Sequence, residues 1–404
     1  MSAPPERAAG EGSVARRPPY EVADVVRAHG AEMLGASGRE RQVLRAIGGC
    51  RTAMLGGHVE ACRGCGYERI AYNSCRNRHC PKCQGAERAR WMAGERAMLL
   101  PVSYFHVVFT LPDVLRGLVR ANRRPLYDLL FRAAAATLRE FARDPKYLGA
   151  EPAITMVLHT WGQTLGEHFH VHSVVSGGGL TADGERWRSV KRRRRAFLFP
   201  VRAMSVVFRG KYLAGLAELR ARGALRLDET LEDARCWRRF AVGLRSRSWV
   251  VYAKPPFGGP ERVLKYLSRY THRVAISNRR LSYVGEGVVR FQYKDYADGS
   301  RTKEMTLGGA EFLRRFLQHV LPKGFMRIRH YGLLANCQRR TKLPRARAAL
   351  AALPACEAIA QERAASPASR EVAASPARTC PTCGQELVIV AILAIVRPRA
   401  LDSS

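Results

Sequence analysis

Four of the eleven histidines of this chain fall in one short stretch, HTWGQTLGEHFHVH, at residues 159–172. The segments 153–161 and 168–179 are rich in β-branched and aromatic residues, which predicts two strands joined as a hairpin. Alternate residues of a strand point to the same face, so His170 and His172 share one face and Val171 lies on the other. Two imidazoles on one face favour a bound metal ion, and the alternative is a pair of exposed histidines on an edge strand.

The register of this hairpin predicts a third metal ligand. If an even-length loop spans residues 162–167, His159 lies directly opposite His170, and directly opposed side chains share a face. A bulge or an odd loop would instead turn His159 to the other face. His168 also lies on the histidine face, but it is two pleats away from His172. We therefore assign His168 to contact with a bound partner or to a place beside the metal ligands.

A cysteine-rich stretch, CRGCGYERIAYNSCRNRHCPKC, precedes the histidines in the sequence. Cys62 and Cys65 form one CxxC knuckle, and Cys80 and Cys83 form another, a spacing that predicts one structural Zn²⁺ held by four thiolates. The stretch offers spare ligands for a second metal or a swapped position: Cys50, His58, Cys75 and His79. A further CxxC at Cys380 and Cys383 is half a zinc site, without partners that the sequence identifies.

The charge of the chain points to a polyanionic partner. There are 68 Lys and Arg against 34 Asp and Glu, a formal net charge of +34. Nucleic acid is the favoured partner because phosphate neutralisation releases counterions, and a ribosome-associated or merely supercharged surface is the alternative. The cysteine-rich stretch carries several basic side chains, which favours DNA contact over a purely structural zinc module: Arg63, Arg69, Arg76, Arg78, Lys82 and Arg88.

The remaining pattern predicts an α+β fold. Strands are predicted at 104–111 and 248–256, a hairpin at 288–307, and helices at 112–143, 201–222, 260–272 and 310–320. Long helices between strands with hairpin turns favour an antiparallel sheet flanked by helices over a doubly wound sheet. No export signal begins the chain, and the longest apolar run, 387–396, is shorter than the ~20 residues of a membrane helix. We therefore expect no membrane association, and cysteines that bind metal in a reducing compartment.

The predicted helix at 260–272 carries Tyr266 and Tyr270 one turn apart on one face. Core packing is the ordinary role of such a pair. A helical projection instead places both tyrosines between the apolar stripe and a flank formed by Arg262, Arg269 and Arg273. These three arginines and His168 are candidate DNA contacts. The tyrosine hydroxyls would then emerge beside guanidinium groups, a position suited to nucleophiles that attack a phosphate.

These segments together resemble the two-tyrosine HUH transposases of the IS-ninety-one type. The resemblance runs from about residue 50 to residue 340. It rests on the cysteine-rich stretch and on LPVSYFHVVFTLP, LHTWGQTLGEHFHVH, YLSRYTHRVAISNRRL and LPKGFMRIRHYGLLAN. Phe169 departs from the family pattern, where proline is expected.

The resemblance implies a DNA transposase of an insertion sequence that nicks and rejoins single strands in a rolling-circle-like transposition. His170 and His172 would hold Mg²⁺ or Mn²⁺, Tyr266 and Tyr270 would form 5′-phosphotyrosine links, and the zinc module would recognise element ends. Single-stranded element ends and target DNA would be its partners, in the bacterial cytoplasm and in association with the nucleoid. We expect four regions: a disordered start with short helices (1–48), the zinc-binding DNA-recognition module (49–95), the HUH catalytic domain (100–344), and a low-complexity linker and tail (345–404).

Two alternatives compete with a transposase. A plasmid replication initiator or a conjugative relaxase would use the same chemistry, but such proteins usually carry a helicase or primase segment, and the GxxxxGK[ST] phosphate loop is absent. A non-catalytic, zinc-dependent nucleic-acid-binding regulator would explain the charge and the cysteines. It would leave the histidine strand and the two tyrosines without a role.

Overall fold

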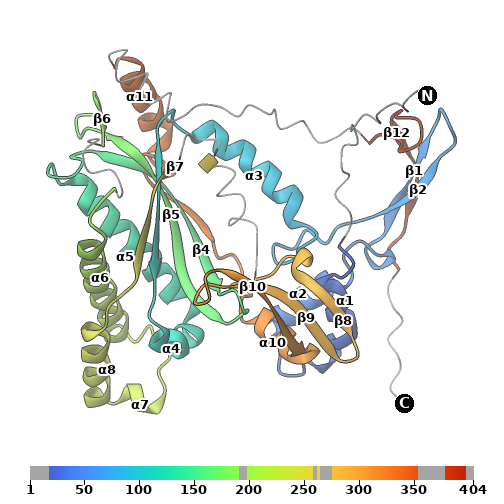
Figure 1. Cartoon of the computed structure of the whole chain (residues 1–404), viewed down its shortest axis with the longest axis horizontal. Coiled ribbons are helices and arrows are strands. Elements are labelled where there is room, and N and C mark those ends of the chain that lie inside the picture. The colour runs from blue at the N-terminus through green and yellow to red at the C-terminus, as the bar shows by residue number, and fades with distance from the viewer. Residues whose placement is uncertain (1–17, 191–197, 258–261, 264–274, 354–377, 397–404) are drawn as a thin grey trace, which may run out of the picture.

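The computed structural model describes residues 18–190, 198–257, 262–263, 275–353 and 378–396. Its central sheet has the strand order β11-β4-β5-β3-β7, with β6 paired to β5, and all of these pairs are antiparallel (Figure 1). The strands are β3 (Tyr104–Thr110), β4 (Glu151–Trp161), β5 (Glu167–Leu180), β6 (Trp187–Ser189), β7 (Val251–Phe257) and β11 (Ile328–Gly332). The predicted antiparallel α+β core is confirmed.

Helices cover one face of this sheet. They are α5 (Arg123–Arg143), α6 (Val201–Ala221) and α8 (Ala234–Ser246), with the short α7 (Glu229–Glu232) before α8. Phe169, Val171 and Val175 of β5 are buried in the core beneath α5 and α6. Because side chains alternate along a strand, His170, His172 and Val174 point to the opposite face. The period of two in the sequence therefore separates an apolar core from a histidine-bearing face, whose histidines are also buried.

The helix predicted at 112–143 is interrupted. A 3-10 turn (Asp113–Leu115) and α4 (Arg116–Ala121) precede α5, and Asn122 leaves the helical conformation with φ −127° and ψ 44°. The buried amide of Asn122 donates to the carbonyl of Arg226 at 2.8 Å, and its oxygen accepts the N–H of Arg226 at 2.7 Å. This pairing ties the break between α4 and α5 to a distant backbone segment.

A second core joins the N-terminal helices to a three-stranded antiparallel sheet in the order β10-β9-β8. Its elements are α1 (Val22–His29), α2 (Gly38–Gly48), β8 (Leu281–Gly285), β9 (Val288–Asp295), β10 (Arg301–Gly308) and α10 (Gly309–Leu317). The short helices predicted before residue 49, the 288–307 hairpin and the helix predicted at 310–320 are thus confirmed. Ser37 caps α2 with a capping box completed by Glu40.

The third sheet has the order β12-β1-β2 and lies apart from the central sheet (Figure 1). Its strands are β1 (Gly57–Cys62), β2 (Glu68–Tyr72) and β12 (Leu387–Leu393). The apolar run near the C-terminus is therefore a strand, and most of its side chains are exposed. In the described part of the chain no helix is long and apolar enough to cross a membrane.

Helix α3 (Gln84–Met98) connects the cysteine-rich stretch to the central sheet. Glu95 near its C-terminal end is buried, and its carboxylate lies 3.3 Å from Nε2 of His330 on β11. Helix α11 (Arg339–Ala351) lies beside it, where the guanidinium of Arg347 donates to the carbonyl of Ala97. Helix α11 continues to Ala351, so the first residues of the region predicted as a linker from residue 345 are helical.

Candidate active site and cysteine clusters

Three histidine side chains meet on the face of the central sheet opposite the α5 and α6 layer. His159 lies on β4, His170 and His172 lie on β5, and one ring nitrogen of each lies within 4.8 Å of the others. His159 pairs directly with His170, which confirms the predicted register. The loop holds residues 162–166 instead of 162–167, and an irregularity between His159 and Trp161 restores the alignment.

The chemistry of these rings suits a metal ion. Burial lowers the pKa of His170 to about 3 and the pKa of His172 well below its usual value, because desolvation penalises the imidazolium form. Both rings are therefore neutral near pH 7. Nδ1–H of His170 donates to the carbonyl of His168 at 2.8 Å, which leaves Nε2 unprotonated. This Nε2 lies 3.1 Å from Nε2 of His172, so a divalent ion that accepts neutral nitrogen ligands fits the cluster.

His106 on β3 is a candidate site residue that sequence reasoning missed. Its Nε2 lies 2.9 Å from Nδ1 of His172, and the two rings stack with centroids 5.1 Å apart. Burial, followed by the charge of Lys254, lowers the pKa of His106 to about 3. When Nδ1–H of His172 donates to His106, Nε2 of His172 keeps its lone pair on the side of His170. The motif FHV offered no local signal, because this contact depends on the pairing of β3 with β5.

Replacing His106 with alanine is expected to weaken Mn²⁺ binding by about 10- to 100-fold, the range found for outer partners of metal-binding histidines. The cause would be the loss of the acceptor that selects the tautomer of His172. His106→Gln, whose amide oxygen accepts the same hydrogen bond, should recover part of the affinity. Calorimetric Mn²⁺ titration measures both variants. His330→Ala is the matched control, and equal affinity of His106→Ala and the parent protein would contradict this role.

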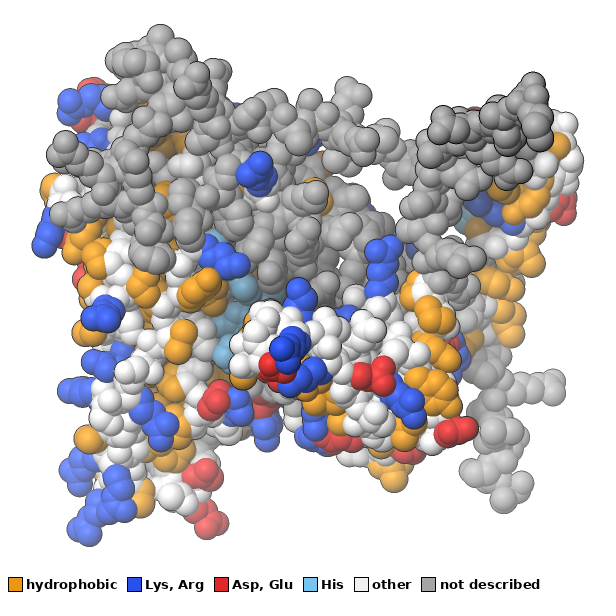
Figure 2. All heavy atoms as spheres, in the orientation of Figure 1, with side chains coloured by type: hydrophobic (Ala, Val, Ile, Leu, Met, Phe, Trp, Pro, Cys, Tyr) orange, Lys and Arg blue, Asp and Glu red, His pale blue; other side chains and the backbone are white. Residues whose placement is uncertain are grey.

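The surroundings of the cluster are aromatic and basic. Trp161 stacks on His159 with ring centroids 4.4 Å apart. Lys254 on β7 pairs with His106 and is exposed on the same face, where it can contact a phosphate. The buried carboxylate of Glu167 binds Arg120 through both oxygens, so it is committed to an ion pair. Some histidine atoms are visible between the part of the molecule that contains the central sheet and the part that contains the β8–β10 sheet (Figure 2).

The structure corrects the predicted zinc ligand set. The cysteines form two groups of four: Cys50, Cys75, Cys80 and Cys83, here called the core cluster, and Cys62, Cys65, Cys380 and Cys383, here called the tail cluster. The physical reason is the hairpin of β1 and β2, which carries Cys62 and Cys65 to its tip. Cys75 follows β2 and therefore lies at the open end of the hairpin, beside Cys50, which precedes β1. The two CxxC knuckles of the predicted set therefore belong to different sites.

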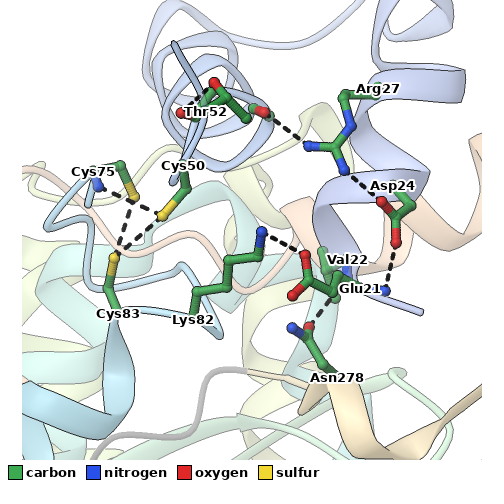
Figure 3. A network of polar contacts seen from close by, with 12 residues as sticks. Glu21, Val22, Asp24, Arg27, Cys50, Thr52, Cys75, Lys82, Cys83 and Asn278 are labelled. Atoms are coloured by element: carbon green, nitrogen blue, oxygen red, sulfur yellow. Dashed lines mark hydrogen bonds and ion pairs between the residues drawn. The ribbon is translucent and has the colours of Figure 1, made fainter. Parts of the chain in front are cut away.

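The core cluster is built into the second hydrophobic core, and Figure 3 shows the sulfurs of Cys50, Cys75 and Cys83 pointing toward one another. The sulfur of Cys83 lies 3.5 Å from that of Cys50 and 3.6 Å from that of Cys75. Next to it, Lys82 Nζ lies 2.5 Å from the carboxylate of Glu21, at the start of α1. Four sulfurs at such distances fit a tetrahedral Zn²⁺. The ion would therefore stabilise the packing of the N-terminal helices as well as the cysteine turns.

Some basic residues of the cysteine-rich module make hydrogen bonds or ion pairs within the protein and so stabilise the fold. Arg78 donates to the carbonyls of Phe325 and Pro322, and Arg69 pairs with the buried carboxylate of Glu60 at 2.7 Å. Lys82 is largely buried in its ion pair. Arg63 and Arg76 are exposed. These two side chains are therefore the stronger candidates for DNA contact among the described basic residues of this stretch.

Four of the predicted site residues lie outside the described residues: Tyr266, Tyr270, Arg269 and Arg273. The predicted helix at 260–272 is described only at Arg262 and Val263, both of which are helical. Arg262 is exposed, and Val263 is fully buried in a cluster with Val157 and Val174. These two valines point to the histidine face. Val263 thus packs on the same side of the sheet as the histidines. His168 is half-buried, and burial lowers its pKa.

Comparison with protein families defines the class of this chain. Residues 25–111 match the transposase zinc-binding domain of the IS91 type, and residues 153–342 match the family described as "Putative transposase". A zinc-binding domain therefore precedes a transposase domain. The zinc-binding match contains the whole core cluster and the β1–β2 half of the tail cluster.

Individual relatives give the particular family. The chain is 47% identical over 395 residues to "Putative transposase y4qJ" of Sinorhizobium fredii, covering 95% of this chain and 98% of that protein. It is 31% identical over 319 residues to the transposase for insertion sequence element IS801 of Pseudomonas savastanoi pv. phaseolicola, covering 76% and 73%. The conjugative relaxase TrwC with a 27-mer DNA aligns at a TM-score of 0.22 and 14% identity, over 41% of this chain and 71% of that chain. The chain belongs to the IS91-type family of transposases.

Proposed function

We propose that this transposase cuts and rejoins single-stranded DNA at the ends of an insertion sequence through 5′-phosphotyrosine intermediates. The convergence of His159, His170 and His172 on one sheet face is the observation that carries the proposal. Val263 packs on this face and precedes Tyr266 by three residues in the sequence. We therefore assign the nucleophile role to Tyr266 and Tyr270, which are four residues apart in the sequence.

The histidine cluster would hold the divalent ion. Its ligands would be Nε2 of His170, Nε2 of His172 and a ring nitrogen of His159. Of the two ions expected from the sequence, Mn²⁺ accepts nitrogen ligands more readily than Mg²⁺. When bound, the ion polarises the scissile phosphodiester and offsets the charge that develops on its oxygens.

The protein's own groups account for the covalent step. The tyrosine oxygen attacks the phosphorus in line, so that a new O–P bond forms while the bond from phosphorus to O3′ breaks. The phenol loses its proton, and the leaving O3′ gains one, which yields a 5′-phosphotyrosine and a free 3′-OH. Arg262, Arg269 and Arg273 are proposed to bind the phosphates of the strand. Attack of a 3′-OH on the phosphotyrosine reverses the step, so strands are joined without ATP.

The N-terminal zinc-binding domain is proposed to recognise the element ends. The predicted boundary at residue 49 would separate α2 from the cysteines with which it packs, so we propose that this domain includes α2. The net charge of +34 supports tight association with DNA, and we place the protein with the nucleoid in the bacterial cytoplasm. Phosphate contacts would dominate affinity, whereas contacts to exposed bases would select the ends.

The test is covalent capture of labelled DNA. The full-length protein is incubated with 5′- and 3′-labelled single strands carrying an element end, with Mn²⁺ or with chelator. A shifted, detergent-stable band that retains the label 3′ to the nick is expected only with Mn²⁺. The same sequence as a blunt duplex is the control substrate. Absence of any adduct would favour a non-catalytic regulator, and adducts that ignore the element end would favour an initiator or a relaxase.

A further inference from the structure

We propose that the tail cluster, Cys62, Cys65, Cys380 and Cys383, binds a second zinc ion that fastens the C-terminal segment to the N-terminal module. Cys62 Sγ lies 3.3 Å from Cys383 Sγ, and Cys65 Sγ lies 3.5 Å from Cys380 Sγ. All four sulfurs lie within 4.8 Å of one another. Tetrahedral zinc with bonds of about 2.3 Å separates its sulfur ligands by about 3.8 Å, so the cluster needs little adjustment.

The two halves of the cluster have the same local structure. Each CxxC pair is followed by a glycine with positive φ, at 72° for Gly66 and 77° for Gly384. The N–H of Gly66 donates to the carbonyl of Cys62 at 3.0 Å, and the N–H of Gly384 donates to that of Cys380 at 2.9 Å. This turn directs both thiols of a knuckle to the same side, and glycine tolerates the left-handed backbone that it requires. Two facing knuckles form a four-thiolate site.

The surrounding backbone and charges bring the same two segments together. β12 pairs antiparallel with β1, and Cys62 lies opposite Leu387. The carboxylate of Glu60 is buried beneath this pairing, where it accepts from Arg69 and lies 3.3 Å from the guanidinium of Arg378 in the tail. Without the tail segment, Glu60 would lose one of its compensating charges. The ion pair between Glu60 and Arg378 therefore holds the tail against β1 in addition to the strand pairing.

Hydrophobic burial alone gives this strand little stability. Leu387 is the side chain of β12 that is buried, whereas Ile389 and Val390 are half exposed and Ile392 is 86% exposed. The cluster joins Cys65 to Cys380, which are 315 positions apart in the sequence. Closing a loop of this length is entropically costly, and a metal clip offsets that cost. The zinc ion therefore determines whether β12 stays on β1.

The two zinc sites differ in their access to solvent. Cys65 and Cys383 of the tail cluster are exposed, whereas three of the four core-cluster cysteines are buried. A chelator or a thiol reagent reaches exposed ligands first. The tail zinc should therefore be the first to leave, and its loss should release the C-terminal strand while the second hydrophobic core remains folded.

Zinc stoichiometry of the full chain tests the site. The protein is prepared with His170→Ala and His172→Ala, so that the histidine cluster does not add to the count. Two zinc ions per chain are expected, with release by a chelator in two phases. Cys380→Ser with Cys383→Ser should leave one ion and remove the fast phase. Cys80→Ser with Cys83→Ser should instead remove the slow phase. The matched control, Cys236→Ser with Cys337→Ser, removes two cysteines outside both clusters and should keep two ions.

Hydrogen exchange gives a second measurement that does not depend on counting metal. The tail-cluster variant should lose amide protection over Leu387–Leu393 while keeping the protection of β9 and β10, which shows that the rest of the chain is folded. Two zinc ions in the Cys380→Ser/Cys383→Ser protein, one ion in the parent, or unchanged protection of β12 would each overturn the proposal. None of these measurements depends on DNA cleavage, so they remain informative if the proposed chemistry fails.

Discussion

Replacing Tyr266 and Tyr270 together with phenylalanine is expected to abolish the covalent protein–DNA adduct. Each substitution removes one hydroxyl oxygen and nothing else, so the nucleophile is lost while the aromatic ring is kept. DNA affinity should change less than about threefold, because basic side chains supply most phosphate contacts. Gel shift in the presence of chelator measures affinity, and detergent-stable bands measure the adduct.

Tyr252→Phe is the matched control for this double variant. Tyr252 lies on β7 with 51% of its surface exposed, and it pairs with Val108 on the histidine face. A nearby tyrosine outside the proposed helix should be dispensable, and its variant should form the adduct at the parental rate. An adduct that persists in the Tyr266→Phe/Tyr270→Phe protein, with DNA mapped by mass spectrometry to another tyrosine, would remove both residues from the mechanism.

The single variants address why the predicted helix at 260–272 carries two tyrosines. One nucleophile holds one strand at a time, whereas the transfer of an element requires a second cleavage before the first link is resolved. Tyr266→Phe and Tyr270→Phe should each retain nicking of one single-stranded end and fail at complete transposition. Complete transposition by either single variant would show that one tyrosine suffices and that its neighbour only packs.

Alanine in place of His170 or His172 is expected to reduce cleavage by more than about 100-fold, the scale of losing one electrostatic group that stabilises a transition state. DNA affinity should be kept, because neither imidazole is charged near pH 7. His159→Ala should weaken metal binding, and excess Mn²⁺ should partly restore cleavage, since two ligands remain. Single-turnover cleavage across a Mn²⁺ titration separates lost affinity from lost rate.

His168→Ala is the control for the histidine variants. Its ring lies beside His170, with centroids 4.8 Å apart, but it contributes to the metal site through its backbone carbonyl, which alanine retains. Its effect on cleavage should therefore be smaller than that of any of the three ligands. An essential His168 together with a dispensable His159 would contradict the ligand assignment, although the register between the strands would stand.

Local patterns in the sequence were sufficient for the histidine cluster. Strand periodicity placed His170 and His172 on one face, and a short hairpin placed His159 opposite His170, because neighbouring strands leave few registers when one face must be buried. The irregularity at Trp161 compensated for the shorter loop. The same short-range signals predicted β3, β7 and α6, whereas α8, β11 and the break at Asn122, whose amide pairs with a distant backbone segment, were not predicted.

Tertiary structure alone decided which cysteines belong together and which residue supports His172. Cys62 and Cys65 are closer in the sequence to Cys80 than to Cys380. The β1–β2 hairpin nevertheless carries them away from Cys80, and the pairing of β12 with β1 brings Cys380 beside them. His106 meets His172 because β3 pairs with β5 across an interval of 66 residues that includes α5. Spacing along the chain measures only local geometry, whereas these contacts depend on the pairing of strands distant in the sequence, which the burial of the whole core determines.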